Sequence, residues 1–437
     1  YKRQVLNTAT SSYFPYGYGY GWYEGNGNVY DENVAVVLSG TSYTSGDVIA
    51  MALDLDNQIL KWYKNNSLAY TVGLNGTDIV MAVGDYANAD DATITCNFGQ
   101  KSFTYTPPTG FVALQQDNLP ETAKGVSGLV WIKSRDTASA HMLFDSTRGP
   151  QLRLKSDSTS AEALSQGTVT KFLKGGYAVG NQTAVNKSGD STVAWNWVAN
   201  GGTTASNGDG SISSTVQANT TAGFSIVKYT GTGSAGTVGH GLSSAPEWIF
   251  GRPIEQTGGY NWSVYHKSLT SASYYLSLNL NTAESSNSNV WGTAPSSSVI
   301  SVGTSMSAST EPMILYCWHG VDGFSKFGKY TGNGVVDGPF VYTGFKPRWV
   351  LHKANNAASW YLYDSARETD NPLLFPLFPD TTVAESSNIY GIDFLSNGFK
   401  LRQPTGYGGN YSGVDVYYMA FAEHPFVGDG TNPTTAR

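Results

Sequence analysis

Charged residues, cysteine and long apolar segments are all scarce in this chain. Charged residues make up 14% of its 437 residues, whereas an ordinary soluble domain has about 25%. This composition excludes a coiled coil, which needs Ala, Glu, Lys, Leu and Arg at heptad spacing. No apolar run reaches the roughly 18 residues that a membrane-spanning helix requires, so we expect no membrane insertion.

Basic residues are also few, and they are not clustered. The chain has 26 Lys and Arg against 33 Asp and Glu, which gives a formal net charge of −7. A nucleic-acid surface normally needs clustered Lys and Arg that displace phosphate counterions. The sequence therefore predicts no nucleic-acid partner.

The cysteines and histidines do not form a recognisable site. Cys96 and Cys317 each lie in an apolar, strand-like stretch, far apart in the sequence. Buried free thiols are the simpler interpretation for such positions. The six histidines show none of the close spacings that indicate a zinc site. We therefore expect no metal and no cofactor.

Glycine and aromatic residues are abundant instead. The chain contains 50 Gly, 28 Tyr, 18 Phe and 11 Trp. So many aromatic side chains can bury too much surface for the chain to stay disordered. With Gly and Asn for the turns, they predict an all-β protein of antiparallel β-sandwich domains in tandem.

The first part of the chain carries a β-hairpin pattern. Apolar residues alternate through 48–55, Asp-Asn at 56–57 predicts a turn, and alternation resumes at 59–63. Two further matches follow, Ala-Val-Gly-Asp-Tyr at 82–86 and Asn-Phe-Gly at 97–99. Together these motifs resemble SPRY domains, which implies a concanavalin-like, two-sheet sandwich. The earliest strands of that family are absent or short here, so we expect residues outside this sequence to complete the domain.

The rest of the chain repeats itself. Three landmarks recur in the same order at a step of 100 or 101 residues: Gly-Phe-Ser (223–225 and 323–325), Pro-x-Trp (246–248 and 347–349) and Ala-Glu-Ser-Ser-Asn (283–287 and 384–388). A more degenerate copy precedes them, in which Trp131 to Arg135 matches 248–252 and 349–353, and Phe144 to Arg148 matches 363–367. Each period is long enough to hold its own core, which favours an array of domains over a solenoid.

The expected organisation follows from these patterns. We predict a SPRY-like sandwich (1–113), a degenerate first repeat (114–200), a linker rich in Gly, Ser, Thr and Asn (201–221), two closer repeats (222–321 and 322–426) and a tail (427–437).

The repeat motifs resemble virion structural proteins of tailed bacteriophages, often described as tail-fibre proteins. The resemblance rests on Gly-Phe-Ser-x-x-x-Tyr-Thr-Gly, on Val-x-Trp-Asn-Trp at 193–197 and on the closing Tyr-Met-Ala-Phe-Ala-Glu-His-Pro-Phe at 418–426. It implies a tail-fibre or appendage subunit that is exposed on the virion, outside the cell, and adheres to the host surface. It also implies a homo-oligomer, with a trimer as the default, that contacts other virion proteins and a host surface glycan or protein.

Catalysis is not expected from the residues themselves. Asp54 and Asp56 share one face of a strand, but they belong to the SPRY hairpin pattern and suit the entry to a turn. No Gly-x-Ser-x-Gly elbow is present. A polysaccharide-degrading tailspike enzyme stays open as an alternative because distant carboxylates could still form a pair across a cleft. A capsid fibre or decoration protein that binds no receptor is the other alternative.

Two aromatic segments are candidates for glycan or receptor contact. In the run at 13–23, alternation with Gly places four aromatic residues on one face of an extended strand: Tyr16, Tyr18, Tyr20 and Trp22. Their rings could stack on sugars, although a core strand or a subunit contact is the simpler explanation. Tyr407 and Tyr411 lie in a second, Gly- and Asn-rich loop that resembles an adaptable recognition loop.

One apolar, Pro-rich stretch is expected to be a packing surface. It covers 372–379 and includes four large side chains: Leu374, Phe375, Leu377 and Phe378. A soluble monomer rarely exposes such a patch. We therefore expect these residues to pack against a neighbouring domain or subunit.

Overall fold

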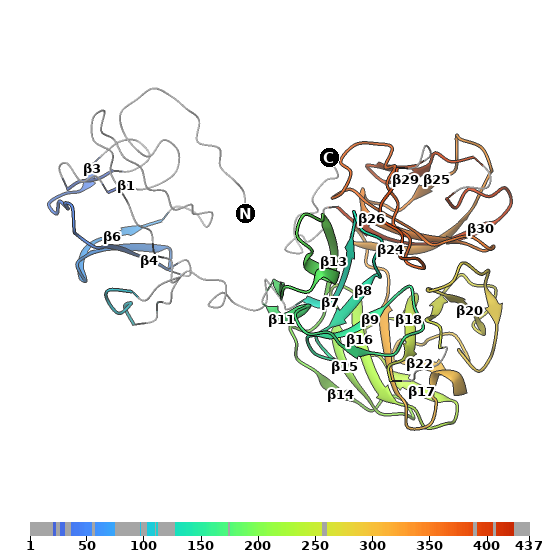
Figure 1. Cartoon of the computed structure of the whole chain (residues 1–437). Coiled ribbons are helices and arrows are strands. Elements are labelled where there is room, and N and C mark those ends of the chain that lie inside the picture. Colours follow the sequence, from blue (N-terminus) through green and yellow to red (C-terminus); the bar gives the residue numbers. More distant parts are fainter. Residues whose placement is uncertain are drawn as a thin grey trace. The chain divides into compact units, whose positions relative to one another are not determined.

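A computed structural model describes twelve stretches of the chain. They are residues 21–22, 27–30, 36–54, 57–74, 97, 103–109, 111, 127–173, 175–255, 260–387, 391–404 and 408–423. The chain divides into two compact units, Tyr1–Pro120 and Glu121–Arg437 (Figure 1). The regular secondary structure of the described residues is nearly all strands in antiparallel sheets, with the short helix α1 (Thr183–Asn186) and the 3-10 turn η3 (Thr304–Met306). The all-β, antiparallel prediction is confirmed.

The first unit contains the predicted hairpin. β4 (Ile49–Asp54) pairs with β5 (Ile59–Lys64), and β6 (Ser67–Gly73) adds a third strand. A second small sheet consists of β1 (Gly21–Trp22), β2 (Val29–Tyr30) and β3 (Val36–Leu38). Leu60 and Trp62 alternate inward along β5 and share one core cluster with Val29 of the other sheet. The relation of this unit to SPRY domains stays a prediction.

Three segments of the second unit contain the same arrangement of central strands. We call residues 127–200 the first segment, 222–321 the second and 322–423 the third. The three central strands are β7 (Ser127–Ser134), β18 (Trp248–Pro253) and β26 (Pro347–Ala354). Each central strand lies between two neighbours. One neighbour is its hairpin partner, which is β8 (Met142–Asp145) in the first segment, β19 (Ser263–His266) in the second and β27 (Tyr361–Asp364) in the third. The other neighbour is the last strand of the segment, which is β13 (Thr192–Val198), β23 (Pro312–Trp318) or β30 (Asp415–Ala422) in the same order.

Further strands extend these main sheets, and each segment adds a smaller sheet. The main-sheet additions are β9 (Leu152–Lys155) and β10 (Ala163–Leu164) in the first segment, β16 (Phe224–Thr230), β20 (Tyr274–Ser277) and β21 (Ser285–Ser286) in the second, and β24 (Ser325–Thr331) in the third. The smaller sheets are β11 (Val169–Leu173) with β12 (Gly176–Val179), β17 (Gly236–Gly239) with β22 (Val299–Val302), and β25 (Phe340–Tyr342) with β29 (Gly398–Leu401) and β28 (Ile392–Leu395).

The stretch 201–221, expected to be a linker, is part of a sheet. It contains β14 (Ala205–Asn207) and β15 (Ser214–Asn219), and β15 pairs with β16 along its whole length. Its Ser, Thr and Asn content resembles that of a linker, but Ile212 and Val216 are buried in the core of the second segment. The linker expectation failed because alternation in the chain, rather than mean polarity, selects a half-buried strand.

The central strands are buried on both faces, and this joins the three segments. On β7, β18 and β26, the residues facing one way belong to a single cluster drawn from all three segments: Leu129, Trp131, Trp248, Phe250, Trp349 and Leu351. The residues facing the other way pack separately, such as Val130 on the first smaller sheet, Ile249 on the second and Val350 on the third. The segments therefore share one central core, and each also keeps a core of its own.

The contacts between segments follow a cycle. The backbone N–H of Glu162 donates to the carbonyl of Ile254 at 2.7 Å, which joins the first segment to the second. The N–H of Glu284 donates to Oδ1 of Asn355 at 3.0 Å, and the N–H of Glu385 donates to the carbonyl of Arg135 at 2.7 Å. These bonds join the second segment to the third and the third to the first. The three segments thus contact one another in a closed cycle.

A second set of contacts repeats in the same way. The residue directly before each hairpin partner donates its backbone N–H to an Asp or Asn side chain. His141 donates to Asp157 at 2.9 Å, Trp262 to Asn279 at 2.9 Å and Trp360 to Asp380 at 3.2 Å. The two indoles at these positions then donate to the preceding segment, Trp262 to the carbonyl of Lys155 at 2.7 Å and Trp360 to that of Ser277 at 2.9 Å.

The strand pairing shows that one match between segments, made from the sequence, is displaced by two residues. Leu129 lies opposite Asp145, and Trp349 lies opposite Asp364. Leu129 is therefore the counterpart of Trp349, and the match of Trp131 with Trp349 is wrong. A slip of two residues keeps every side chain on the same face of a strand, so alternation alone could not reveal it.

The shared core predicts that damage in one segment loosens all three. Leu351→Ala should lower the free energy of unfolding by about 2–5 kcal/mol, the range for deleting a buried leucine side chain. Chemical denaturation of the full chain measures this loss. Hydrogen exchange followed by mass spectrometry should become faster in strands of all three segments. Val383→Ala, at a side chain that is 46% exposed, should change stability by about 0.5 kcal/mol at most. Faster exchange restricted to the third segment would contradict the shared core.

Candidate functional site

Three charged groups of the first segment, Asp145, Arg148 and Glu162, form a buried network. Arg148 pairs with Asp145 and, at 2.6 Å from Nη1 to Oε2, with Glu162. Asp145 also accepts the hydroxyl of Tyr316 from the second segment at 2.6 Å. Nearby Asp145 raises the pKa of Arg148 despite the burial. Every member has its partners, so the network is structural rather than a poised acid and base.

The third segment contains the same network, and the second lacks it. Arg367 pairs with Asp364 at 2.6 Å and with Glu385 at 3.0 Å. Asp364 accepts the indole N–H of Trp195 from the first segment at 3.1 Å. In the second segment, His266 occupies the position of the aspartate because it lies opposite Trp248, and the residue three positions later is a leucine.

A buried cation ends each of the three central strands. Lys133, Arg252 and Lys353 are all fully buried. Each donates to the carbonyl of the following residue and to further loop carbonyls. Burial lowers the pKa of Lys133 and of Lys353 to about 8, and that of Arg252 to about 10. Lys133 and Lys353 hold the loops that follow their own strands, and Arg252 holds the loop at 158–159 of the first segment.

Among the described residues, no three His, Cys, Asp or Glu side chains lie close enough to hold a metal ion. Cys317 is a buried free thiol whose pKa is raised by burial, and Cys96 lies outside the described residues.

Asp54 accepts the backbone N–H of Asn57 at 3.0 Å and so stabilises the hairpin turn. Within the described part of the chain, no helix is long and apolar enough to cross a membrane.

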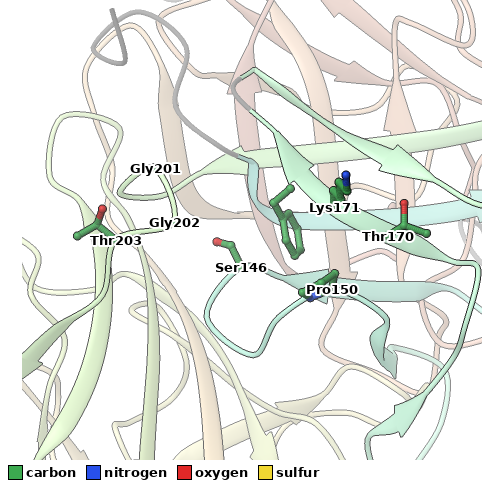
Figure 2. A pocket seen from close by; sticks show the side chains of 8 residues that line it. Ser146, Pro150, Thr170, Lys171, Gly201, Gly202 and Thr203 are labelled. Carbon is green, nitrogen blue, oxygen red and sulfur yellow. The ribbon is translucent and has the colours of Figure 1, made fainter. Parts of the chain in front are cut away.

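An open depression of about 510 Å³ lies on the first segment. Figure 2 shows Gly201, Gly202 and Thr203 on one side of it, and Thr170 and Lys171 of β11 on the other. Ser146, Pro150 and Phe172 complete its lining. Beneath it, the fully buried Gln217 accepts the N–H of Gly202 at 3.2 Å and the hydroxyl of Ser146 at 3.0 Å. The wall is therefore well fixed, and the lining contains no carboxylate.

The aromatic run predicted for glycan contact is described only at its end. Tyr16, Tyr18 and Tyr20 lie outside the described residues. Trp22 lies against the core of the first unit, and its indole N–H donates to the carbonyl of Thr41 at 2.8 Å. Its ring also meets the edge of Tyr70, with the ring centroids 5.2 Å apart. Trp22 thus packs as a core residue rather than as an exposed ring.

The recognition loop and the Pro-rich stretch are also placed. Tyr407 lies outside the described residues, and Tyr411 is half-buried against the core of the third segment, where burial raises its pKa.

In the Pro-rich stretch, Leu377 is fully buried in the shared core. Leu374, Phe375 and Phe378 are half-buried. The carbonyl of Pro379 accepts the hydroxyl of Ser156 at 2.7 Å, so the stretch meets the first segment.

β25 carries an exposed aromatic pair, Phe340 and Tyr342, that was not predicted from the sequence. Phe340 is 45% exposed and Tyr342 is 59% exposed, whereas Val341 between them is buried. Both rings point away from the core on a strand at the edge of its sheet. The signal was present in the sequence, as an aromatic–Val–aromatic alternation directly after Pro339.

Comparison with known proteins places the second unit in a family. A family model described as a domain of unknown function (DUF7483) matches residues 115–425. The chain belongs to this family. The DUF7483 match spans all three segments, in keeping with their shared core. No curated protein matches the chain, and no solved structure matches it.

The buried network of this DUF7483 domain predicts a large effect of Arg367→Met. The variant leaves Asp364 buried without its cation and leaves Glu385 with Arg135 as its remaining cation, so the free energy of unfolding should fall by about 3–5 kcal/mol. Urea denaturation measures it. Arg348→Met is the matched control, because Arg348 makes only a 3.6 Å surface pair with Glu423 and should cost about 1 kcal/mol or less. The double variant D364H/R367L, which carries the residues of the second segment, should recover part of the loss. An Arg367→Met variant as stable as the control would contradict this role.

Two buried histidines predict a loss of stability in acid. Burial lowers the pKa of His266 and of His352 to about 3, against about 6.5 in an unfolded chain. The unfolded chain therefore binds more protons between pH 6.5 and 3, and stability falls as the pH falls through that range. At pH 4 each histidine should cost about 3 kcal/mol relative to pH 7.

The test uses His352→Phe, because His352 stacks on Tyr361 and on Tyr363 with ring centroids 5.5 and 5.9 Å apart and a phenyl ring can keep that packing. Urea denaturation at pH 7 and pH 4 should show a pH effect smaller by about 3 kcal/mol in the variant. The carboxylates titrate alike in both proteins, so they cancel. An unchanged pH effect would show that His352 does not carry it.

Proposed function

We propose that this chain is a structural protein of a bacteriophage particle, most simply a tail-fibre or appendage subunit that adheres to the host cell surface. The repeat motifs and the closing motif at 418–426 support the virion setting. The exposed aromatic pair Phe340 and Tyr342 is the observation that supports adhesion. It stands outward on the edge strand β25 of its sheet.

The proposal also covers location and partners. The chain would be exposed on the virion, outside the cell, in contact with other virion proteins and with a host surface glycan or protein. Self-association, with a trimer as the default, would need other surfaces than the inward faces of the main sheets. Those faces are already buried against one another within one chain.

Adhesion is favoured over a polysaccharide-degrading enzyme. A glycosidase needs two carboxyl groups on either side of the scissile bond, and the lining of the open depression contains neither Asp nor Glu. Asp145 of the first segment and Asp364 of the third are paired with arginine in buried networks. Nothing in the described residues favours the enzyme.

The test has two readouts on the intact particle and its host. Gold-labelled antibody against the purified chain should bind an appendage in electron micrographs. Purified full-length chain, added to host cells first, should slow adsorption of the particle several-fold, because it occupies the same receptor. Heat-unfolded chain is the control and should have no effect. Labelling of the head alone, with unchanged adsorption, would overturn the adhesion proposal and favour a capsid fibre or decoration protein.

A further inference from the structure

We propose that the outward face of the β25–β29–β28 sheet binds an acidic carbohydrate through Phe340, Tyr342 and Lys326. This inference rests on the proposed adhesive function and names its site and the class of its ligand. The described aromatic rings of this face are exposed, flat and flanked by charged groups in fixed positions. Such a surface can cover the apolar face of a sugar ring and bond its hydroxyl and acidic groups.

The register of the sheet sets these groups side by side. Phe340 lies opposite Lys400, which lies opposite Asp393, so one row across the face runs from ring to cation to carboxylate. In the next row, Tyr342 lies opposite Gly398. A Cβ at Gly398 would come within 2.9 Å of Phe340 Cζ, which shows that the phenyl ring rests on the glycine backbone. One side of the ring is therefore covered, and its other side is available.

The second segment provides an internal comparison. There, Val238 lies opposite Ile300 in the smaller sheet, as Val341 lies opposite Phe399 in the third segment, and both valines are buried. The neighbours of Val238 are Thr237 and Gly239, where the third segment has Phe340 and Tyr342. The same sheet thus forms without aromatic residues at these positions, so the fold does not require the exposed pair.

The charges of the face favour an acidic ligand. Lys400 pairs with Asp337 at 2.9 Å, and Arg402 pairs with Asp393 at 2.6 Å. The ammonium of Lys326, which comes from β24 of the main sheet, lies 4.9 Å from the centre of the Tyr342 ring. These described groups bring three cations and two carboxylates together beside the rings, in a chain of net charge −7.

The same charges argue against a protein partner at this face. The cores of protein interfaces are depleted in Lys and Asp, whereas here Lys400 and Asp393 stand in the same row as Phe340. The described edge strand is also only three residues long, which is short for pairing with a strand of another protein. Interleaved rings and charges suit a sugar better.

The experiment is affinity electrophoresis of the full-length chain in gels that contain alginate, an acidic polymer of uronic acids, or dextran, a neutral polymer. Alginate should retard the chain and dextran should not. The double variant F340T/Y342T, which places threonine where the second segment has small residues, should bind alginate about tenfold more weakly because both rings are lost. Lys326→Gln should remove most of the preference for alginate over dextran.

Leu164→Thr is the matched control, because Leu164 is a 64% exposed apolar residue on a strand of the first segment. It should bind alginate like the unchanged chain, and circular dichroism should show all variants folded. Equal retardation by dextran, no retardation by either polymer, or full binding by F340T/Y342T would each overturn the inference. A chain that blocks particle adsorption without binding alginate would overturn this site and leave the proposed function standing. A chain that binds alginate without blocking adsorption would overturn the proposed function and leave this binding site standing.

Discussion

The burial of both faces of β7, β18 and β26 is the constraint on which the second unit depends. Alternate residues of a strand point to opposite sides of its sheet, so each main sheet needs two covers. The smaller sheet of the same segment provides one cover, and the other two segments together provide the second. A segment on its own would expose a face of large aromatic and aliphatic side chains, which makes the three segments fold as one body.

The buried charges act within this frame by selecting one arrangement of the segments. A buried ion pair gains little net free energy, because desolvation offsets most of the attraction. The Asp145–Arg148 and Asp364–Arg367 pairs each also accept a donor from another segment, Tyr316 and Trp195 respectively. The groups are satisfied only when the segments meet in the observed cycle. A mismatched arrangement would leave several of them buried without partners, at a cost of about 1–3 kcal/mol for each group.

The second segment shows how far the network can change while the cycle stays. It has His266 in place of the aspartate, and its glutamate, Glu284, bonds Asn355 at 2.9 Å and the hydroxyl of Tyr417 at 3.1 Å. The contact to the next segment is therefore kept with neutral partners. In the core, the three segments keep side chains at corresponding positions of the network, while the residue types at these positions differ. Outside, the third segment adds Phe340 and Tyr342 to the smaller sheet, and the proposed function depends on this outward difference.

The all-β class and the hairpin of β4 and β5 could be predicted from the sequence, because they depend on alternation and on local turns. The sequence also indicated that the apolar stretch at 372–379 would be covered. Only the tertiary structure decided the rest. The strands at 205–219, the two-residue shift at Trp131 and the shared core depend on which faces meet, and a period of two does not record that. The exposure of Phe340 and Tyr342 was decided there too, since an aromatic side chain reads the same in sequence whether its ring is buried or faces water.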